Sequence, residues 1–349
     1  MYPRTLSFFI DYKCNYYCDH CSAGSHPSRS SPLSLEVIKK LLDKGKPLGF
    51  KLAVFTGGEP TLDMKKLLSA LEYAKSLGYK TRVITNGWWA KTPESALQIL
   101  SEMKDAGLDE LNTDFDDYHL DLRKKRWDAS AQNFVNIAKA TVDLDIPLGI
   151  GIIKGPNTII DREFVAKFLA VHLKMSMEEV NKRFKFVEDV VARIGRAAKE
   201  IPQEEVPERE LPVSGCNDIG MVYGVHPDGR ITVCCGHAIF VSDAYDIGNW
   251  KEEDEPLKTV RKRASQNLIY WWIWAVGPKK ILKKLGIEKK TTHICDACKI
   301  LLVDHRKELI EYFTKHKEEI LINEILLNNR ARETLNLVKK VGEYDIYIP

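Results

Sequence analysis

Residues 6–21 read Leu6-Ser-Phe-Phe-Ile-Asp-Tyr-Lys-Cys-Asn-Tyr-Tyr-Cys-Asp-His-Cys21. The apolar run Leu6–Ile10 predicts a buried strand. Three cysteines with the spacing C-x3-C-x2-C follow it directly, so they fall in the loop at the carboxyl end of that strand. In parallel α/β folds and barrels, functional sites are built at this end of the strands. The stretch therefore predicts a metal or redox site on a parallel α/β scaffold.

Short apolar runs and longer amphipathic stretches alternate from this point to about residue 154. The predicted strands are Leu6–Ile10, Leu52–Phe55, Thr81–Thr85, Glu110–Thr113 and Leu148–Ile153. The predicted helices are Leu35–Lys44, with Ser34 as its N-cap, then Asp63–Leu77, Glu94–Ala106 and Ala129–Leu144. This alternation is typical of βαβ units and a parallel sheet. Two further amphipathic stretches follow, Arg162–Lys174 and Met177–Glu200, with Arg183–Val187 as a candidate strand.

A segment rich in proline and acidic residues, Ile201–Pro212, interrupts the alternation and predicts a boundary. Beyond it, Met221–Val225 and Arg230–Val233 flank an Asp-Gly turn signal and predict a hairpin. After residue 300 a charged helical pattern runs to about residue 340. We therefore expect a core domain over residues 1–205, a small second domain over residues 206–300 and a helical segment over residues 301–349.

Composition narrows the class of protein. The 52 basic and 49 acidic residues leave a net charge of +3, too small an excess to indicate a nucleic-acid partner. The N-terminus shows no secretory signal, so we expect a cytoplasmic protein, where clustered cysteines more often bind metal than form disulfides. The most apolar run, Leu268–Val276, is far shorter than the roughly 20 residues that span a bilayer. Its three tryptophans favour core packing over a place on a membrane surface.

Cys14, Cys18 and Cys21 suit a [4Fe–4S] cluster, because three thiolates on one loop can hold three irons and leave the fourth open. Zinc is the structural alternative, with His20 or His26 as the fourth ligand. A second motif, Thr56-Gly-Gly-Glu-Pro60, follows the second predicted strand. Its glycines let the backbone approach a ligand closely, and Glu59 offers an acceptor to a cationic group.

Together these two motifs resemble the radical S-adenosylmethionine (SAM) superfamily over roughly residues 5–200. The resemblance implies a partial (β/α)6 TIM-type barrel, here followed by a small C-terminal α+β iron–sulfur extension and terminal helices. It implies that Cys14, Cys18 and Cys21 bind a [4Fe–4S] cluster whose open iron chelates SAM. The SAM-binding positions that it implies are His20 near adenine, Gly57, Gly58, Glu59 and Pro60 near the methionyl amino group, and Thr85 and Asn86 near the ribose and carboxylate.

Asp114 departs from the family pattern, because it stands where a serine is usual in the segment that contacts SAM. A second carboxylate beside that of SAM would be repulsive unless a cation offsets it. We therefore expect Asp114 either to face the substrate or to cap the next turn. The lone histidines His119 and His226 are interpreted as structural.

The resemblance also implies the chemistry. An external one-electron donor, such as flavodoxin or ferredoxin, reduces the cluster, and SAM is cleaved to methionine and a 5′-deoxyadenosyl radical. That radical abstracts a hydrogen atom from the substrate, while the protein positions and shields the reacting groups.

The remaining cysteines are Cys216, Cys234, Cys235, Cys295 and Cys298. By spacing alone, four of them suit zinc and a fully ligated cluster equally well. The segment resembles the SPASM/twitch extension of radical SAM enzymes, which implies an auxiliary [4Fe–4S] cluster held by Cys216, Cys234, Cys295 and Cys298.

Cys235 is then left over. It is inert, an exchangeable ligand, or a donor of a hydrogen atom to a substrate radical, as in the radical SAM peptide epimerases that this layout resembles. The leading hypothesis is epimerisation of a ribosomal peptide. The alternatives are radical oxidation, such as thioether or C–C crosslinking of a peptide or dehydrogenation of a small molecule, and a non-catalytic zinc-binding protein.

Overall fold

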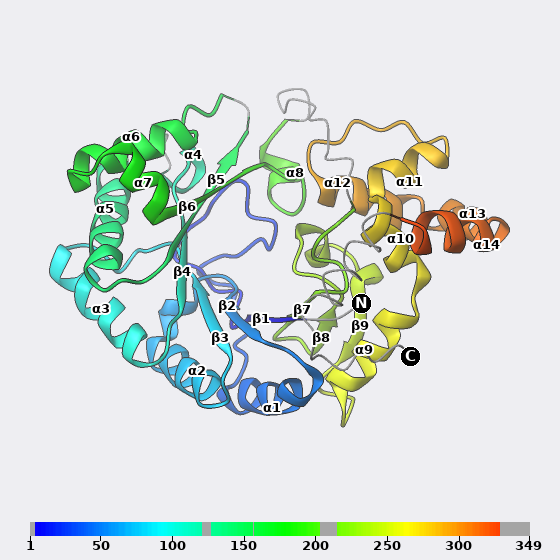
Figure 1. The fold of residues 1–349 in the computed structure, drawn as a ribbon, viewed down its shortest axis with the longest axis horizontal. Helices are drawn as coiled ribbons and strands as arrows, with labels where there is room; N and C mark the ends of the chain where they lie inside the picture. The colour runs from blue at the N-terminus through cyan, green and yellow to red at the C-terminus, as the bar shows by residue number, and fades with distance from the viewer. Residues whose placement is uncertain (1–3, 121–126, 156, 203–214, 329–349) are drawn as a thin grey trace.

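The computed structural model describes residues 4–120, 127–155, 157–202 and 215–328. One nine-stranded sheet, of order β6-β5-β4-β3-β2-β1-β7-β8-β9, runs through it. The strands β1 to β6 pair in parallel, each with the next, and all of them lie in the part of the chain predicted as the core domain. Figure 1 shows this sheet curving around the centre of the molecule, with the helices α1, α2, α3, α5 and α6 along its outer side. The sheet is not closed, which confirms a partial TIM-type barrel.

The six parallel strands begin and end within three residues of their predicted bounds. They are β1 Thr5–Phe9, β2 Leu52–Thr56, β3 Lys80–Ile84, β4 Glu110–Asp114, β5 Leu148–Lys154 and β6 Phe184–Val190. The helices between them are α1 Leu35–Gly45, α2 Met64–Ser76, α3 Pro93–Asp105, α4 Asp117–Leu120, α5 Trp127–Asp143, α6 Arg162–Leu173 and α7 Met177–Arg183. Short 3-10 turns, η1 Lys46–Leu48 and η2 Pro60–Asp63, join two of the pairs. The Ser34 side chain accepts from the backbone N–H of Val37, which confirms the predicted cap of α1.

Two faces of the sheet can be told apart from packing. Leu6 faces the helices, because a Cβ added at Gly45, the last residue of α1, would lie 2.9 Å from Leu6 Cδ1. Side chains alternate along a strand, so Ser7 faces the opposite, concave side. The strand register carries this concave face to Arg82 on β3 and Glu110 on β4, which form an ion pair at 3.0 Å.

The interpretation of Met177–Glu200 as one amphipathic stretch is wrong. Helix α7 ends at Arg183, and the next seven residues form β6, paired over its whole length with β5. A short helix, α8 Ala197–Glu200, follows a turn. The candidate strand Arg183–Val187 marked the correct place but stopped three residues early. Pairing with β5 decides the conformation here, because strand formation depends on neighbours more than on local sequence.

The hairpin beyond the predicted boundary is confirmed. Strands β7 Val222–Val225 and β8 Arg230–Thr232 pair antiparallel, and Gly229 takes φ +112° in the turn. The sequence did not indicate that β7 pairs parallel with β1, or that β9 Asp246–Asn249 adds to β8. The hairpin therefore extends the barrel sheet itself. Most of the boundary segment Ile201–Pro212 lies outside the described residues.

Further helices lie in the half of the molecule that holds β7, β8 and β9 (Figure 1). They are α9 Pro256–Gln266, α10 Leu268–Val276, α11 Pro278–Lys284, α12 Ile294–Lys299, α13 Arg306–Lys315 and α14 Lys317–Glu319, with 3-10 turns η4 His237–Phe240 and η5 Asp243–Tyr245 and π-helical turns η6 Ile300–Asp304 and η7 Ile320–Leu326. Trp272 of α10 is fully buried and stacks on Tyr312 of α13, which confirms core packing for the apolar run. No helix in the described ranges is both long and apolar enough to span a membrane. The predicted helical pattern beyond residue 328 lies outside the described residues.

Candidate functional site

The Gly-Gly motif packs against the loop that leads to the first cysteine. A Cβ added at Gly58 would lie 2.0 Å from the carbonyl oxygen of Lys13. The Gly58 N–H donates to Asp11 O at 2.6 Å, and the Glu59 N–H donates to Lys13 O at 2.8 Å. Gly57 takes φ +138°, a conformation that favours glycine. The glycines thus join the end of β2 to the residues just before Cys14, in addition to any approach to a ligand.

Glu59 is buried and held by donors from two loops. Its Oε1 accepts from the backbone N–H of Thr61 at 3.0 Å and from the hydroxyls of Thr61 and Thr85 at 2.5 and 2.8 Å. Its Oε2 accepts from the Asn86 N–H at 2.8 Å. Burial raises the pKa of Glu59, against the hydrogen bonds, which lower it. Oε2, with one protein donor, is the atom with capacity left for the amino group of a ligand.

Asn86 connects this carboxylate to the cysteine loop. Its amide Nδ2 donates to Asn15 Oδ1 at 2.9 Å and lies 3.7 Å from Cys14 Sγ. Thr85 is buried, and its hydroxyl is directed at Glu59. The carboxyl ends of β1, β2 and β3 therefore bring Cys14, Glu59 and Asn86 into one hydrogen-bonded group.

The first three cysteines share one loop and one electrostatic environment. Burial raises the pKa of Cys14 to about 11, with Glu59 and Cys21 adding to the rise. Burial also raises the pKa of Cys18, and the other two cysteines raise it further. Thiols that raise one another's pKa in this way favour a cation that would stabilise them as thiolates. The Nδ1 of His26 is engaged by Ser28, so a zinc ion could use only its Nε2.

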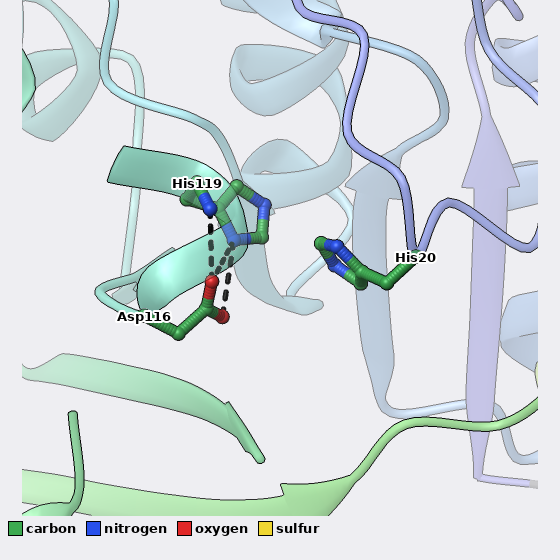
Figure 2. A group of neighbouring side chains, drawn as sticks. All are labelled: His20, Asp116 and His119. Atoms are coloured by element: carbon green, nitrogen blue, oxygen red, sulfur yellow. Dashed lines mark hydrogen bonds and ion pairs between the residues drawn. The ribbon is translucent and has the colours of Figure 1, made fainter. Parts of the chain in front are cut away.

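His20 points from this loop toward a histidine–aspartate pair at the end of β4, as Figure 2 shows. His119 Nδ1 lies 3.0 Å from Asp116 Oδ1, and its Nε2 lies 3.5 Å from Asp114 Oδ2. Burial alone would lower the pKa of His119, but the two carboxylates overcome it and raise the pKa to about 9. Burial lowers the pKa of His20 to about 3, and its buried Nδ1 has no partner. Ligand atoms of His20, Asp116 and His119 lie within 4.8 Å of one another, as a metal site requires, but the raised pKa keeps His119 protonated at neutral pH.

Asp114 lies on the concave face, two pairs along β4 from Glu110. A Cβ added at Gly151 of β5 would lie 2.1 Å from its Oδ1, so the glycine makes room for this carboxylate. The cation needed to offset Asp114 is the His119 imidazolium. The sequence interpretation of His119 as a lone structural residue missed this role. The spacing Asp-x2-His at the start of a helix was the available signal, since residues three apart on a helix are neighbours.

The other five cysteines line one cavity of about 230 Å³. It lies where β8, η4 and the start of α12 meet, and its walls also include Asp218, His237, Tyr245 and His293. A Cβ added at Gly236 would lie 2.9 Å from Cys295 Sγ and 3.8 Å from Cys234 Sγ, so this glycine leaves room between the sulfurs. Segments far apart in sequence thus bring together the whole second cysteine group.

Cys235 differs from its neighbour in what surrounds it. Burial raises the pKa of Cys234, and the charges of Cys216 and Cys298 raise it further. Burial also raises the pKa of Cys235, with Asp218 and Cys216 adding to it, while the guanidinium of Arg82 lowers it. Since Arg82 lies on the concave face of the barrel sheet, Cys235 is within electrostatic reach of the barrel interior.

One contact joins the cysteine groups, and a second ties the Cys295 segment to β6. Ser22, next to Cys21, has its hydroxyl 2.8 Å from His237 Nδ1. His293 Nδ1 accepts from the Cys295 N–H at 3.0 Å, so its Nε2 carries the proton and donates to Asp189 Oδ2 at 2.9 Å. His226 is likewise bonded on both ring nitrogens, as expected for a structural residue.

Comparisons with known proteins agree with this geometry. The model of the radical SAM superfamily matches residues 10–169. The putative peptide biosynthesis protein YydG of Bacillus subtilis (strain 168) is 24% identical over 332 residues, which cover 91% of this chain and 98% of that protein. A probable GTP 3′,8-cyclase of Sulfolobus acidocaldarius is 32% identical over 109 residues, covering 31% of this chain and 32% of that protein.

Among solved structures, anSMEcpe with bound AdoMet covers 90% of this chain and 97% of its own, with 15% identity and a TM-score of 0.50. That likeness shows the fold. The matched domain, the open parallel barrel and the motifs at its carboxyl edge lead to one conclusion: residues 10–169 form a radical SAM domain, and radical SAM enzymes use a [4Fe–4S] cluster and SAM.

Proposed function

We propose that this radical SAM enzyme modifies a ribosomally made peptide, and that the modification is epimerisation at a backbone Cα. The observation that carries the reaction type is Cys235, a fifth cysteine on a cavity that needs four, within reach of Arg82 on the concave face. The peptide substrate is supported by the match to a putative peptide biosynthesis protein along nearly the full length of both chains.

Cys14, Cys18 and Cys21 hold the SAM-binding cluster in this proposal. A tetrahedral zinc with Zn–S bonds of about 2.3 Å would hold its sulfurs about 3.8 Å apart. All eight cysteines are among the described residues, and no three of their sulfurs lie within 4.8 Å of one another. A cubane, with separate irons, holds its thiolates farther apart, so this spacing favours a cluster at both cysteine groups.

SAM fits the neighbouring groups. Glu59 Oε2 keeps acceptor capacity for the amino group, and Gly57 and Gly58 pack against the cysteine loop beside it. Pro60 begins the turn η2 after Glu59, and the buried Nδ1 of His20, which has no partner in the structure, would be available to adenine. Asp114 is offset by His119, which removes the repulsion expected for a lone carboxylate.

The second domain, residues 206–300, carries the auxiliary cluster in this proposal, with Cys216, Cys234, Cys295 and Cys298 as its ligands. Its cavity is apolar apart from the thiols, Asp189, Asp218 and two histidines, and it is shielded by Tyr245. Because Cys234 and Cys235 are adjacent, their side chains leave the backbone in different directions. Cys234 lies near the Cys295 sulfur across Gly236, while Cys235 lines the same cavity and is under the influence of the Arg82 charge.

When bound by Cys14, Cys18, Cys21 and the Glu59 group, the cluster and SAM would supply the radical chemistry for loss of the Cα hydrogen atom of the peptide. Cys235 then donates its thiol hydrogen to the opposite face of Cα, so that an S–H bond breaks and a C–H bond forms. The resulting thiyl group takes one electron from the external donor and one proton from solvent to regenerate the thiol. Cys235 is partly exposed and lines the cavity, so its thiol is accessible to a substrate radical there.

Radical oxidation is the second candidate, and the second cysteine group supports it. A cluster bound there could accept an electron from the substrate radical. In that case the peptide gains a crosslink or a double bond, and no hydrogen returns to Cα. Cys235 then has no role in turnover.

The test uses the anaerobically reconstituted enzyme in deuterated buffer with candidate precursor peptides as substrates. The wild type should cleave SAM and place one solvent deuterium at an inverted Cα. Cys235→Ala should cleave SAM with the same iron content but yield no epimer. Cys234→Ala is the matched control, and it should lose about half the iron, as expected for a ligand of one of two clusters. Normal epimerisation by Cys235→Ala would refute the role of this thiol, and a product that is two hydrogens lighter would establish oxidation instead.

A further inference from the structure

Arg196, which belongs to none of the sequence motifs, reaches from the turn after β6 to the loop of the first three cysteines. Its backbone N–H donates to Cys21 O at 3.1 Å. Its Nη1 donates to Cys18 O at 2.8 Å and its Nη2 to Ser25 O at 2.5 Å. One residue thus binds three carbonyl groups distributed over the whole second half of the cysteine loop.

The neighbouring residue shows that this contact is built into the backbone. Gly195 takes φ +65°, and a Cβ added there would lie 2.2 Å from the carbonyl oxygen of Ser22. Only glycine allows so close an approach of the two chain segments. The turn after β6 is therefore shaped to fit the cysteine loop, and Arg196 enters the loop from it.

The charge of Arg196 has no acidic partner nearby. The side chain is buried, with 8% of the residue exposed, and its guanidinium lies 3.6 Å from the ring centroid of Tyr17. Within the part of the chain that the structure describes, no carboxylate comes within 4.0 Å of it. Buried cations are costly unless paired, and carbonyl groups compensate only in part. A cluster held by three thiolates carries net negative charge and would complete the compensation.

We propose that Arg196 is a positioning residue for the SAM-binding cluster: its fork fixes the three-cysteine loop, and its charge favours the reduced state of the cluster bound there. This inference rests on the proposed ligation by Cys14, Cys18 and Cys21. Reduction adds one electron from the external donor and makes the group more negative, so a fixed cation beside it raises the reduction potential. The electron is added without forming or breaking a bond.

Two variants separate the fork from the charge. Arg196→Lys keeps the charge but cannot donate to two carbonyls in a planar fork, and Arg196→Gln removes the charge. Arg193→Gln is the matched control, because Arg193 lies three residues away and its guanidinium donates to Ala198 O and Ile201 O in its own segment.

The first measurement is a redox titration of the reconstituted full-length enzyme, followed by electron paramagnetic resonance. The relevant signal is the one that changes when SAM is added. At the potential that reduces half of this cluster in the wild type, Arg196→Gln should show about a tenfold lower ratio of reduced to oxidised cluster, equivalent to about 59 mV for one electron. Arg196→Lys and Arg193→Gln should stay within about twofold of the wild type, because both retain the Arg196-site charge.

The second measurement is amide hydrogen exchange of residues 14–26 in the metal-free protein. Both Arg196 variants should exchange faster than the wild type, and Arg193→Gln should not. Wild-type potential in Arg196→Gln would overturn the charge role, and wild-type exchange in both Arg196 variants would overturn the positioning role. A wild type without a SAM-sensitive signal would refute the proposed ligation, and exchange in the loop would still decide whether Arg196 holds it.

Discussion

Glu59→Gln tests whether the buried carboxylate holds the site together. The substitution keeps the shape of the side chain but replaces one acceptor oxygen with an NH₂ donor. Whichever way the amide turns, that donor faces a backbone N–H, of Asn86 at the Oε2 position or of Thr61 at the Oε1 position. Hydroxyls can rotate to relieve such a conflict, whereas backbone N–H groups cannot.

The expected cost follows from these contacts. One charge-assisted hydrogen bond is lost, about 1.5–3 kcal/mol, and one buried donor is left unsatisfied, about 1–3 kcal/mol. We expect the free energy of unfolding of the metal-free protein to fall by about 3 kcal/mol, measured from urea unfolding curves at constant slope. SAM affinity should fall at least tenfold in the reconstituted enzyme, since 1.4 kcal/mol corresponds to tenfold.

Glu94→Gln is the control for the Glu59 substitution. Glu94 is exposed in the first turn of α3, where loss of its charge should cost less than about 1 kcal/mol. If Glu59→Gln unfolds at the same urea concentration as Glu94→Gln, the hydrogen-bonded group at the ends of β1, β2 and β3 is not what orders this edge of the barrel.

Three further outcomes follow from the same structure. Gly58→Ala should displace the loop at Lys13. The iron content of the reconstituted protein should then fall from about eight to about four per chain, as expected for loss of one of two cubanes. Full iron loading would contradict the packing described for that glycine. His119 should stabilise the fold most below pH 6.5 and lose that contribution as the pH rises through 9, because Asp116 and Asp114 raise its pKa in the folded state. NMR titration of the ring measures this pKa, and the His119→Gln variant should lack the pH-dependent contribution. A ring that titrates at 6.5 would refute the prediction. Trp272→Ala should lower the free energy of unfolding by about 3–5 kcal/mol, because it empties a fully buried position between α10 and α13, and a loss below about 1 kcal/mol would show that the C-terminal helices do not depend on it.

Local pattern was enough for the first five strands and for the cap of the first helix. The run Leu6–Ile10 and the cap at Ser34 are decided by residues next to them in sequence, so they could be predicted. Strand β6 and the pairing of β7 with β1 depend on partners more than 30 and 200 residues away, respectively, which no local period records.

The site divides in the same way. The clustering of cysteines in the sequence predicted the two groups that the structure shows, one on a single loop and one around a single cavity. The role of His119 depends on how the turn after β4 returns its ring to Asp114 and Asp116. The role of Arg196 depends on contact between the turn after β6 and a loop about 170 residues earlier. These contacts are tertiary, and sequence alone gave no spacing for them.

The central claim is that Cys14, Cys18 and Cys21 hold a cluster that cleaves SAM. Its most direct test is metal analysis and product analysis of the reconstituted wild type beside the triple Cys→Ala variant at these positions. The wild type should contain about eight irons per chain and release 5′-deoxyadenosine with dithionite and SAM, and the variant should retain about four irons and release none. Two zinc ions in place of iron in the wild type, or SAM cleavage by the triple variant, would contradict the account.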